Sequence, residues 1–330
     1  MNDLSYKVPS IVVAVLVFFI SLILFRYHTG GDQSVYVGIW NELEKLDFSE
    51  GRKHYQKYLT SQELVHFLLV DLFSKIIEKS IFMSFCNSLL AYSLMLLFRK
   101  LRVHYLIAVL IVLTNYYLYV LYLPAERLKF GIIFLVLSIY YLNNYKNFLS
   151  FAVLAFLSHF SVLIIYVSIL WKYFLIKFSD IFTKHKMTYS LLLLIIFLLL
   201  AGILFGGTIV DKSINYVYTK QFDYLGVRRT LVEYAGLKSL IKPTIFLIAS
   251  LIYAKNKTDT ILIFIPLIIG AFIIGDDRVN MFCYFIFMYG ALQYRNGFNL
   301  GILLSCIYFG IKSYSFVYQV IKYGNGFWLV

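Results

Sequence analysis

The chain has 330 residues, of which 61% are hydrophobic and only 14% are charged, and its formal net charge is +13. So much apolar surface excludes a soluble domain of this size and indicates a polytopic membrane protein. Because cytoplasmic loops of membrane proteins are enriched in Lys and Arg, the basic excess does not indicate binding to nucleic acid.

Apolar runs of about membrane-spanning length fill the sequence from the N-terminus onward. They predict an all-α fold, a helical bundle of about 11 transmembrane helices that forms a single transmembrane domain over residues 1–330. The runs cover residues 8–25, 80–98, 103–123, 129–143, 148–158, 161–177, 188–205, 239–254, 259–275, 278–294 and 298–316.

Residues 62–79 follow a different pattern, in which polar side chains recur at helical spacing opposite leucine and isoleucine. The polar positions are Glu63, His66, Asp71, Lys75 and Glu78. This pattern predicts an amphipathic helix that lies at the membrane interface and does not cross the membrane.

The basic residues of the short loops set the predicted orientation. If 62–79 does not span, most of them lie on the side of the N-terminus, which is therefore cytoplasmic. They are Lys7, Arg99, Lys100, Arg102, Lys146, Lys172, Lys177, Lys184, Lys186, Lys255, Lys257 and Arg295. Two long loops, 26–61 and 206–238, then face outward together with short turns near 124–128 and 276–278.

The first outward turn contains Pro124, which ends one apolar run, and Arg127, which opens the next. A guanidinium beside the unpaired N–H groups of a helix start makes a site for a phosphate or diphosphate. Alternatively, Arg127 and Lys129 extend to the lipid headgroups, as cations near span ends commonly do.

The second outward turn repeats this arrangement, because Arg278 again starts an apolar run after a tight turn. Asp276 and Asp277 precede it and are candidate metal ligands. Adjacent carboxylates also cap helices and pair with a neighbouring arginine, and we favour that role.

A histidine lies inside the stretch 148–177, which is too long for one straight span. We expect a helix break at Ser158-His159, so that His159 lies at or below the outer surface. Two roles are open for His159: a buried imidazole satisfied by a serine, or a general base that titrates near neutral pH.

After the first span, Gly30 and Gly31 precede Asp32 and predict a tight turn that presents the carboxylate toward the membrane surface. Asp32 is equally suited to be the N-cap of a following helix.

The outward loop 206–238 combines Arg228 and Arg229 with several tyrosines. Aromatic rings beside arginines suit a sugar chain next to a diphosphate. The same residue types also form the aromatic belts found at membrane interfaces.

In their order along the chain, these motifs resemble the Wzy-type polymerases of O-antigen, capsule and exopolysaccharide, in the EpsG-like branch. The matching positions are Gly30, Asp32 and Tyr36 after the first span, Arg127 at a middle span start, His159 within 158–161, and Arg278 with Tyr284 in a late span. Each motif is short, so their order and the predicted topology carry the resemblance.

The resemblance implies a GT-C-like glycosyltransferase that needs no metal or other cofactor. It would act on undecaprenyl-diphosphate-linked repeat units at the extracytoplasmic face of the bacterial inner or plasma membrane, surrounded by membrane lipids. The residues expected at the diphosphate and glycan are Arg127, Arg278, Arg228, Arg229 and Tyr36. The residues expected to act in catalysis are Arg278, which stabilises the leaving diphosphate, and His159 or Asp32, either of which would activate the acceptor hydroxyl.

Two other functions stay open at this point. A flippase for lipid-linked oligosaccharide would carry polar residues within many spans, whereas the charged residues here lie mostly near the ends of the apolar runs. An O-antigen ligase uses the same donor with a different acceptor. By resemblance, a chain-length regulator and a flippase are the expected partner proteins.

Overall fold

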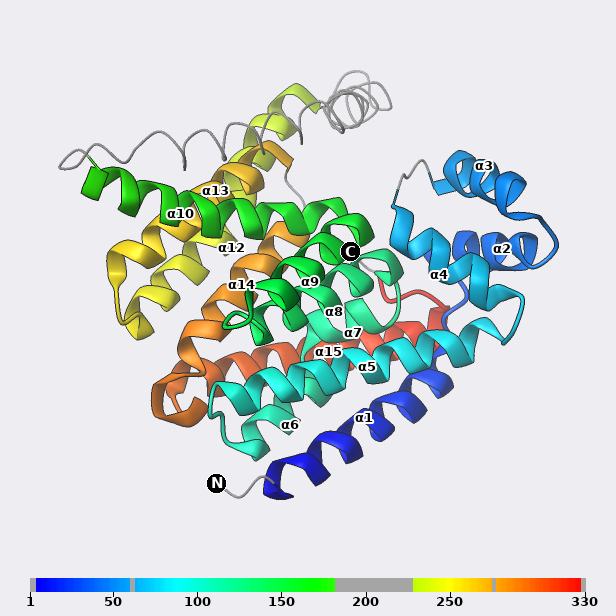
Figure 1. Ribbon diagram of the computed structural model, residues 1–330, viewed down its shortest axis with the longest axis horizontal. Helices are drawn as coiled ribbons and strands as arrows, with labels where there is room; N and C mark the ends of the chain where they lie inside the picture. Colours follow the sequence, from blue (N-terminus) through cyan, green and yellow to red (C-terminus); the bar gives the residue numbers. More distant parts are fainter. Residues whose placement is uncertain (1–3, 60–62, 182–227, 275–276, 328–330) are drawn as a thin grey trace. The chain divides into compact units, whose positions relative to one another are not determined.

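The computed structural model describes residues 4–59, 63–181, 228–274 and 277–327. Within these ranges the chain forms helices joined by turns and contains no strand, so the predicted all-α class is confirmed there (Figure 1). The helices are α1 (Leu4–Phe25), α2 (Asp32–Leu43), α3 (Phe48–Leu59), α4 (Leu64–Ser74), α5 (Lys79–Lys100), α6 (Tyr105–Thr114), α7 (Tyr116–Tyr122), α8 (Glu126–Tyr140), α9 (Tyr145–Ser158), α10 (Leu163–Ile181), α12 (Arg228–Tyr253), α13 (Lys257–Ile274), α14 (Asp277–Ala291) and α15 (Leu300–Tyr323), with short 3₁₀ turns η1 (Phe160–Val162) and η2 (Tyr294–Gly297).

Among the described residues, three segments are long and apolar enough to cross a membrane: Tyr6–Phe25, Lys79–Lys100 and Tyr294–Tyr323. A fourth is formed if α6 and α7, which meet at an angle of 57°, act as one broken span. These segments support a membrane location, whereas about 11 spans and a GT-C-like fold stay predictions.

The chain divides into two compact units, although the sequence indicated one domain. The first comprises Met1–Leu163 and Ala291–Val330, and the second comprises Ile164–Gly290. Each unit has its own packing and is described separately.

In the first unit, α1 packs along α5, α5 also packs on α8, and α8 packs on α9 (Figure 1). Leu90 and Met95 of α5 and Ile133 of α8 are almost completely buried. Close packing of this kind holds helices together in a membrane, where lipid is as apolar as the side chains.

Polar residues mark the helix breaks of this unit. Asn115 separates α6 from α7: its backbone is extended and its side chain accepts a hydrogen bond from the N–H of Tyr117, as an N-cap does. The predicted break at Ser158-His159 is confirmed, because α9 ends at Ser158 and His159 has an extended backbone.

The predicted loop 26–61 contains two helices, α2 and α3. The turn before α2 lies against the end of α15, where the N–H groups of Thr29 and Gly30 both donate to the carbonyl of Gly324. Gly31 has φ of +64° and is the N-cap of α2, which explains the need for glycine there. Asp32 is the first helical residue, so the proposed N-cap role for Asp32 is wrong.

The amphipathic helix predicted over 62–79 is shorter, since α4 covers Leu64–Ser74 and a turn then leads into α5. Its two faces are separated as expected, but the polar face points inward. His66 and Asp71 are buried, whereas Leu68 and Leu72 are exposed. An outward leucine face with an inward polar face is the arrangement that suits a helix lying against lipid.

In the second unit, α12 packs on α13. Lys172 of α10 forms an ion pair of 2.6 Å with Asp259 of α13, and the hydroxyl of Ser239 donates to the carbonyl of Ala271. Most of the predicted outward loop 206–238 lies outside the described residues.

Candidate functional site

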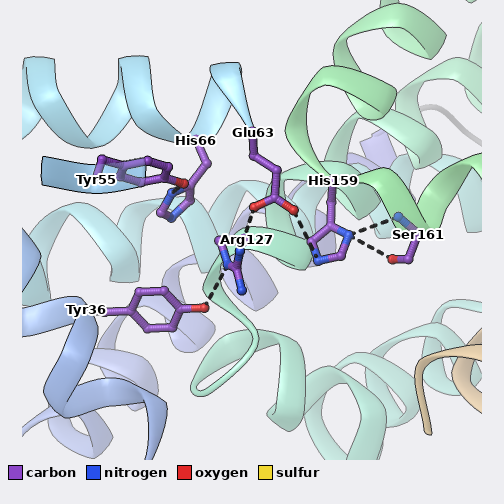
Figure 2. Close-up of polar contacts among 7 residues, drawn as sticks. All are labelled: Tyr36, Tyr55, Glu63, His66, Arg127, His159 and Ser161. Atoms are coloured by element: carbon purple, nitrogen blue, oxygen red, sulfur yellow. Dashed lines mark hydrogen bonds and ion pairs between the residues drawn. The ribbon is translucent and has the colours of Figure 1, made fainter. Parts of the chain in front are cut away.

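Three of the residues singled out in the sequence, Tyr36, Arg127 and His159, lie together in the first unit around Glu63 (Figure 2). They come from α2, the start of α8, the end of α9 and the start of α4. Segments that are far apart in the sequence therefore form one polar cluster, which we call the Glu63–Arg127 cluster.

Arg127 is at the centre of this cluster. Its Nε donates to the hydroxyl of Tyr36 at 3.1 Å, and its Nη1 donates to Oε2 of Glu63 at 3.1 Å. A guanidinium has five N–H groups, and these contacts use two of them. Arg127 is therefore fixed in place by protein contacts, and the role predicted for it at a phosphate or diphosphate stays a prediction.

Tyr36 is buried, and its hydroxyl accepts the hydrogen bond from Arg127. Burial raises the pKa of Tyr36, although the positive charge of Arg127 acts in the opposite direction. The phenol therefore stays protonated at neutral pH and keeps an O–H that can donate to a ligand.

Glu63 was not among the site residues chosen from the sequence. It is the N-cap residue of α4, yet its side chain makes no capping hydrogen bond. Its two carboxylate oxygens face other partners instead, Oε2 toward Arg127 and Oε1 toward Nε2 of His159 at 3.6 Å. The side chain of Glu63 is thus held by two residues of the cluster and not by the helix end.

The imidazole of His159 is oriented by Ser161. The backbone N–H of Ser161 donates to Nδ1 at 3.2 Å, and the Ser161 hydroxyl lies 2.8 Å from the same nitrogen. Because Nδ1 is an acceptor, a neutral ring carries its proton on Nε2, the atom that faces Glu63. His159 thus matches the geometry of the buried, serine-satisfied histidine.

Gly131 permits this arrangement by allowing α8 to approach the segment that carries His159. A Cβ at Gly131 would lie 2.8 Å from Cγ2 of Val162 and 3.1 Å from Cβ of His159. Any larger residue would displace the His159 segment from α8.

The first unit contains two further polar pairs, formed by residues of α3, α4, α5 and α8. The Tyr55 hydroxyl and Nδ1 of His66 are 2.8 Å apart. Figure 2 shows the two side chains next to one another. Burial, together with the charge of Arg127 and nearby lysines, lowers the pKa of His66 well below its usual value, so the ring is neutral. Lys79 of α5 pairs with Glu126 of α8 at 2.6 Å.

Lys129 is also buried, and it donates to the carbonyl of Tyr122. Extension of Lys129 to the lipid headgroups, one of the two alternatives from the sequence, is therefore wrong.

Asp32 lies outside the cluster, and Arg278 belongs to the second unit. Asp32 is exposed at the start of α2, one turn before Tyr36. Arg278 is exposed near the start of α14 in the second unit, as expected for a span start. Its role at the diphosphate stays a prediction.

Four other candidates fall at or beyond the edge of the described chain. The backbone of Arg228 and Arg229 opens α12, and that of Asp277 opens α14, but their side chains lie outside the described residues, as does all of Asp276. Over the ranges that are described, no group of three or more His, Cys, Asp or Glu side chains is placed to hold a metal ion.

Comparison with known proteins assigns neither a family nor a function to the chain. No family model matches it, and no curated protein or solved structure matches it. The Glu63–Arg127 cluster and the motifs of the sequence are therefore the features from which a function is proposed.

Proposed function

We propose that the protein is a polysaccharide polymerase, a glycosyltransferase that joins undecaprenyl-diphosphate-linked repeat units at the extracytoplasmic face of the bacterial cell membrane. The observation that carries this proposal is the buried carboxylate of Glu63 between Arg127 and His159. It supplies a proton acceptor beside an anion-binding guanidinium, the two groups that the reaction needs.

In the proposed reaction, a hydroxyl oxygen of the incoming unit attacks the anomeric carbon of the growing glycan. The bond between this carbon and the phosphate oxygen breaks, and the electron pair leaves with the lipid diphosphate. The hydroxyl proton passes to Glu63. Arg127, already oriented by Tyr36 and Glu63, stabilises the charge that develops on the diphosphate.

His159 acts in this account as a positioning residue. Its Nε2–H faces the Oε1 atom of Glu63, while Ser161 holds the other side of the ring. This contact orients the carboxylate without competing for the proton of the acceptor hydroxyl. Arg278, with Arg228 or Arg229, is proposed to support the diphosphate.

The proposal is tested on surface glycans of a host that lacks the gene, separated on a gel. We expect single repeat units to reach the surface and the ladder of longer chains to be absent, with the ladder restored by the wild-type gene but not by Arg127→Ala. If no repeat unit reaches the surface, the protein acts in transport. If a ladder forms but is not attached to its final acceptor, it acts as a ligase.

A further inference from the structure

The first unit contains a cavity of about 810 Å³ that is separate from the hydrogen bonds of the Glu63–Arg127 cluster. Its walls come from the end of α1 and the turn after it, one face of α2, and the turn that joins α4 to α5. This volume is within the range of small-molecule sites, about 300–1,000 Å³.

Two buried polar atoms at this cavity have no hydrogen-bond partner in the protein. They are Nδ1 of His28 and Oε1 of Gln33, and both residues line the cavity with no more than 3% of their surface exposed. An unsatisfied buried polar atom costs about 1–3 kcal/mol, so two at one cavity point to a ligand that supplies the missing partners.

The two cations of the cavity wall are already paired with carboxylates of the protein. Lys79 pairs with Glu126 at 2.6 Å, and Lys75 pairs with Asp71 at 3.0 Å. Glu78 accepts a hydrogen bond from the hydroxyl of Ser80. Cations that are paired in this way do not call for an anion, and the carboxylates of Glu44 and Glu78 at the wall also disfavour one, so an uncharged ligand suits this cavity.

The rest of the cavity wall consists of an aromatic side chain and neutral polar side chains. Trp40 lines the cavity on the same face of α2 as Gln33, one helical turn further on from Val37, and Asn41 adds an amide at the more exposed edge. Neutral amides, an uncharged imidazole and an indole match a ligand that carries hydroxyl groups around an apolar ring face.

The cavity adjoins the Glu63–Arg127 cluster through two residues. The hydroxyl of Tyr36, on α2, accepts a hydrogen bond from Arg127, and the Nζ of Lys79, which lines the cavity, lies 5.7 Å from the centre of the Tyr36 ring. A ligand in the cavity is therefore separated from the cluster by the Tyr36–Lys79 contact.

We propose that this cavity binds a neutral sugar residue, with Gln33 and His28 hydrogen-bonded to its hydroxyl groups and Trp40 forming one apolar wall. The further step, that this sugar is a residue of the acceptor glycan, rests on the proposed polymerase function. Sugar binding itself rests on the cavity alone.

The test uses tryptophan fluorescence, because the chain has only three tryptophans. Trp171→Phe and Trp328→Phe together leave Trp40 as the reporter in the full-length protein. The protein is placed in lipid nanodiscs, since maltoside detergents carry sugar headgroups that would compete. Glucose, galactose, rhamnose, N-acetylglucosamine and N-acetylgalactosamine are titrated one by one, with glycerol as the solvent control.

We expect at least one sugar to change the Trp40 emission saturably, with a midpoint in the millimolar range, and glycerol to have no such effect. Gln33→Leu should raise the midpoint at least tenfold without lowering the melting temperature, because the side-chain oxygen it removes has no protein partner. Asn41→Ala, at the exposed edge, should weaken binding in a protein whose core is untouched. Val35→Ala, on the exposed side of α2 away from the cavity, should leave the midpoint unchanged.

No saturable response to any of the five sugars overturns the proposal, as does a midpoint that neither Gln33→Leu nor Asn41→Ala changes. These results are independent of the polymerase test. A missing sugar response together with a ladder that depends on Arg127 refutes the cavity assignment alone. A sugar response in a protein whose loss leaves the ladder intact refutes the polymerase function alone.

Discussion

The carboxylate of Glu63 contacts the guanidinium of Arg127 at 3.1 Å, although 64 positions separate the two residues in the chain. The pair is mostly buried, with 6% of the Glu63 side chain and 19% of the Arg127 side chain exposed. Breaking such a pair by removing one partner leaves an uncompensated charge, so both residues are sensitive positions for stability as well as for function.

Glu63→Gln tests the carboxylate as proton acceptor. The amide keeps the size and can still accept a hydrogen bond from Arg127, but it cannot take up a proton. We expect polymer formation to slow at least about 100-fold, the lower end of general base catalysis, in a protein that reaches the membrane at normal levels. Glu42→Gln, on the exposed face of α2, is the control and should give a normal ladder. A normal ladder in Glu63→Gln would remove this carboxylate from the reaction.

Arg127→Lys tests the shape of the guanidinium separately from its charge. A lysine keeps the positive charge but cannot contact Tyr36, Glu63 and a diphosphate in the same planar fork. We expect chain length on the glycan gel to fall to short oligomers or single units. Arg26→Lys, an exposed residue after the first span, should have no effect. Wild-type chain length in Arg127→Lys would mean that charge alone suffices.

Two substitutions of His159 distinguish a positioning role from the role of a general base. His159→Gln retains an N–H that can face Glu63, whereas His159→Phe retains only the ring shape. We expect His159→Gln to keep a measurable part of the polymerase rate and His159→Phe to lose it, because the contact with Oε1 of Glu63 needs a donor. Equal loss in both variants, with a pH profile of the remaining rate that has lost a near-neutral group, would instead assign His159 as the base.

Acid should destabilise the first unit through His28. Burial, together with the charges of Lys79 and Lys129, lowers the pKa of His28 from 6.5 to about 4. Below pH 6.5 the imidazole of His28 is protonated in the unfolded chain but stays neutral in the folded chain. The contribution of His28 to the free energy of unfolding is therefore fully present above pH 6.5 and is lost as the pH falls toward 4. The loss at pH 5 is about 2 kcal/mol.

Thermal unfolding of the purified protein at pH 7.5 and pH 5 measures this effect, with His28→Gln as the variant that cannot titrate. The melting temperature of the wild type should fall more between the two pH values than that of His28→Gln. Identical shifts in the two proteins would show that other groups cause the acid sensitivity.

Removal of divalent metal ions should leave polymer formation intact, because Arg127 is placed to balance the charge of the diphosphate. Washing membranes with EDTA and measuring the ladder formed from lipid-linked units tests this expectation. Loss of the ladder that Mg²⁺ or Mn²⁺ restores would favour the metal role for Asp276 and Asp277.

Helix positions and three of the site residues could be predicted from the sequence because their signals are local. Apolar runs mark α1, α5 and α15, and the motifs of Arg127 and His159 lie at breaks between such runs. Helices α2 and α3 were missed because residues 26–61 are polar enough to be taken for a loop.

Glu63 could not be selected in the same way, since nothing near it in the sequence marks it as different from the other polar residues of 62–79. Its significance comes from contacts with Arg127 and His159, both distant in the chain. The sequence predicts an amphipathic helix at the interface but not that its polar face points inward, and only that direction shows that the carboxylate needs a partner.

The most direct test of the Glu63–Arg127 cluster as the site of polymerisation uses purified protein in lipid nanodiscs, supplied only with undecaprenyl-diphosphate-linked repeat units. Chain growth is measured by separating the products by length. The account predicts a ladder with the wild-type protein and single units with Glu63→Gln, while Glu42→Gln behaves as the wild type. A wild-type protein that forms no ladder under these conditions, or a Glu63→Gln protein that forms a normal one, contradicts it.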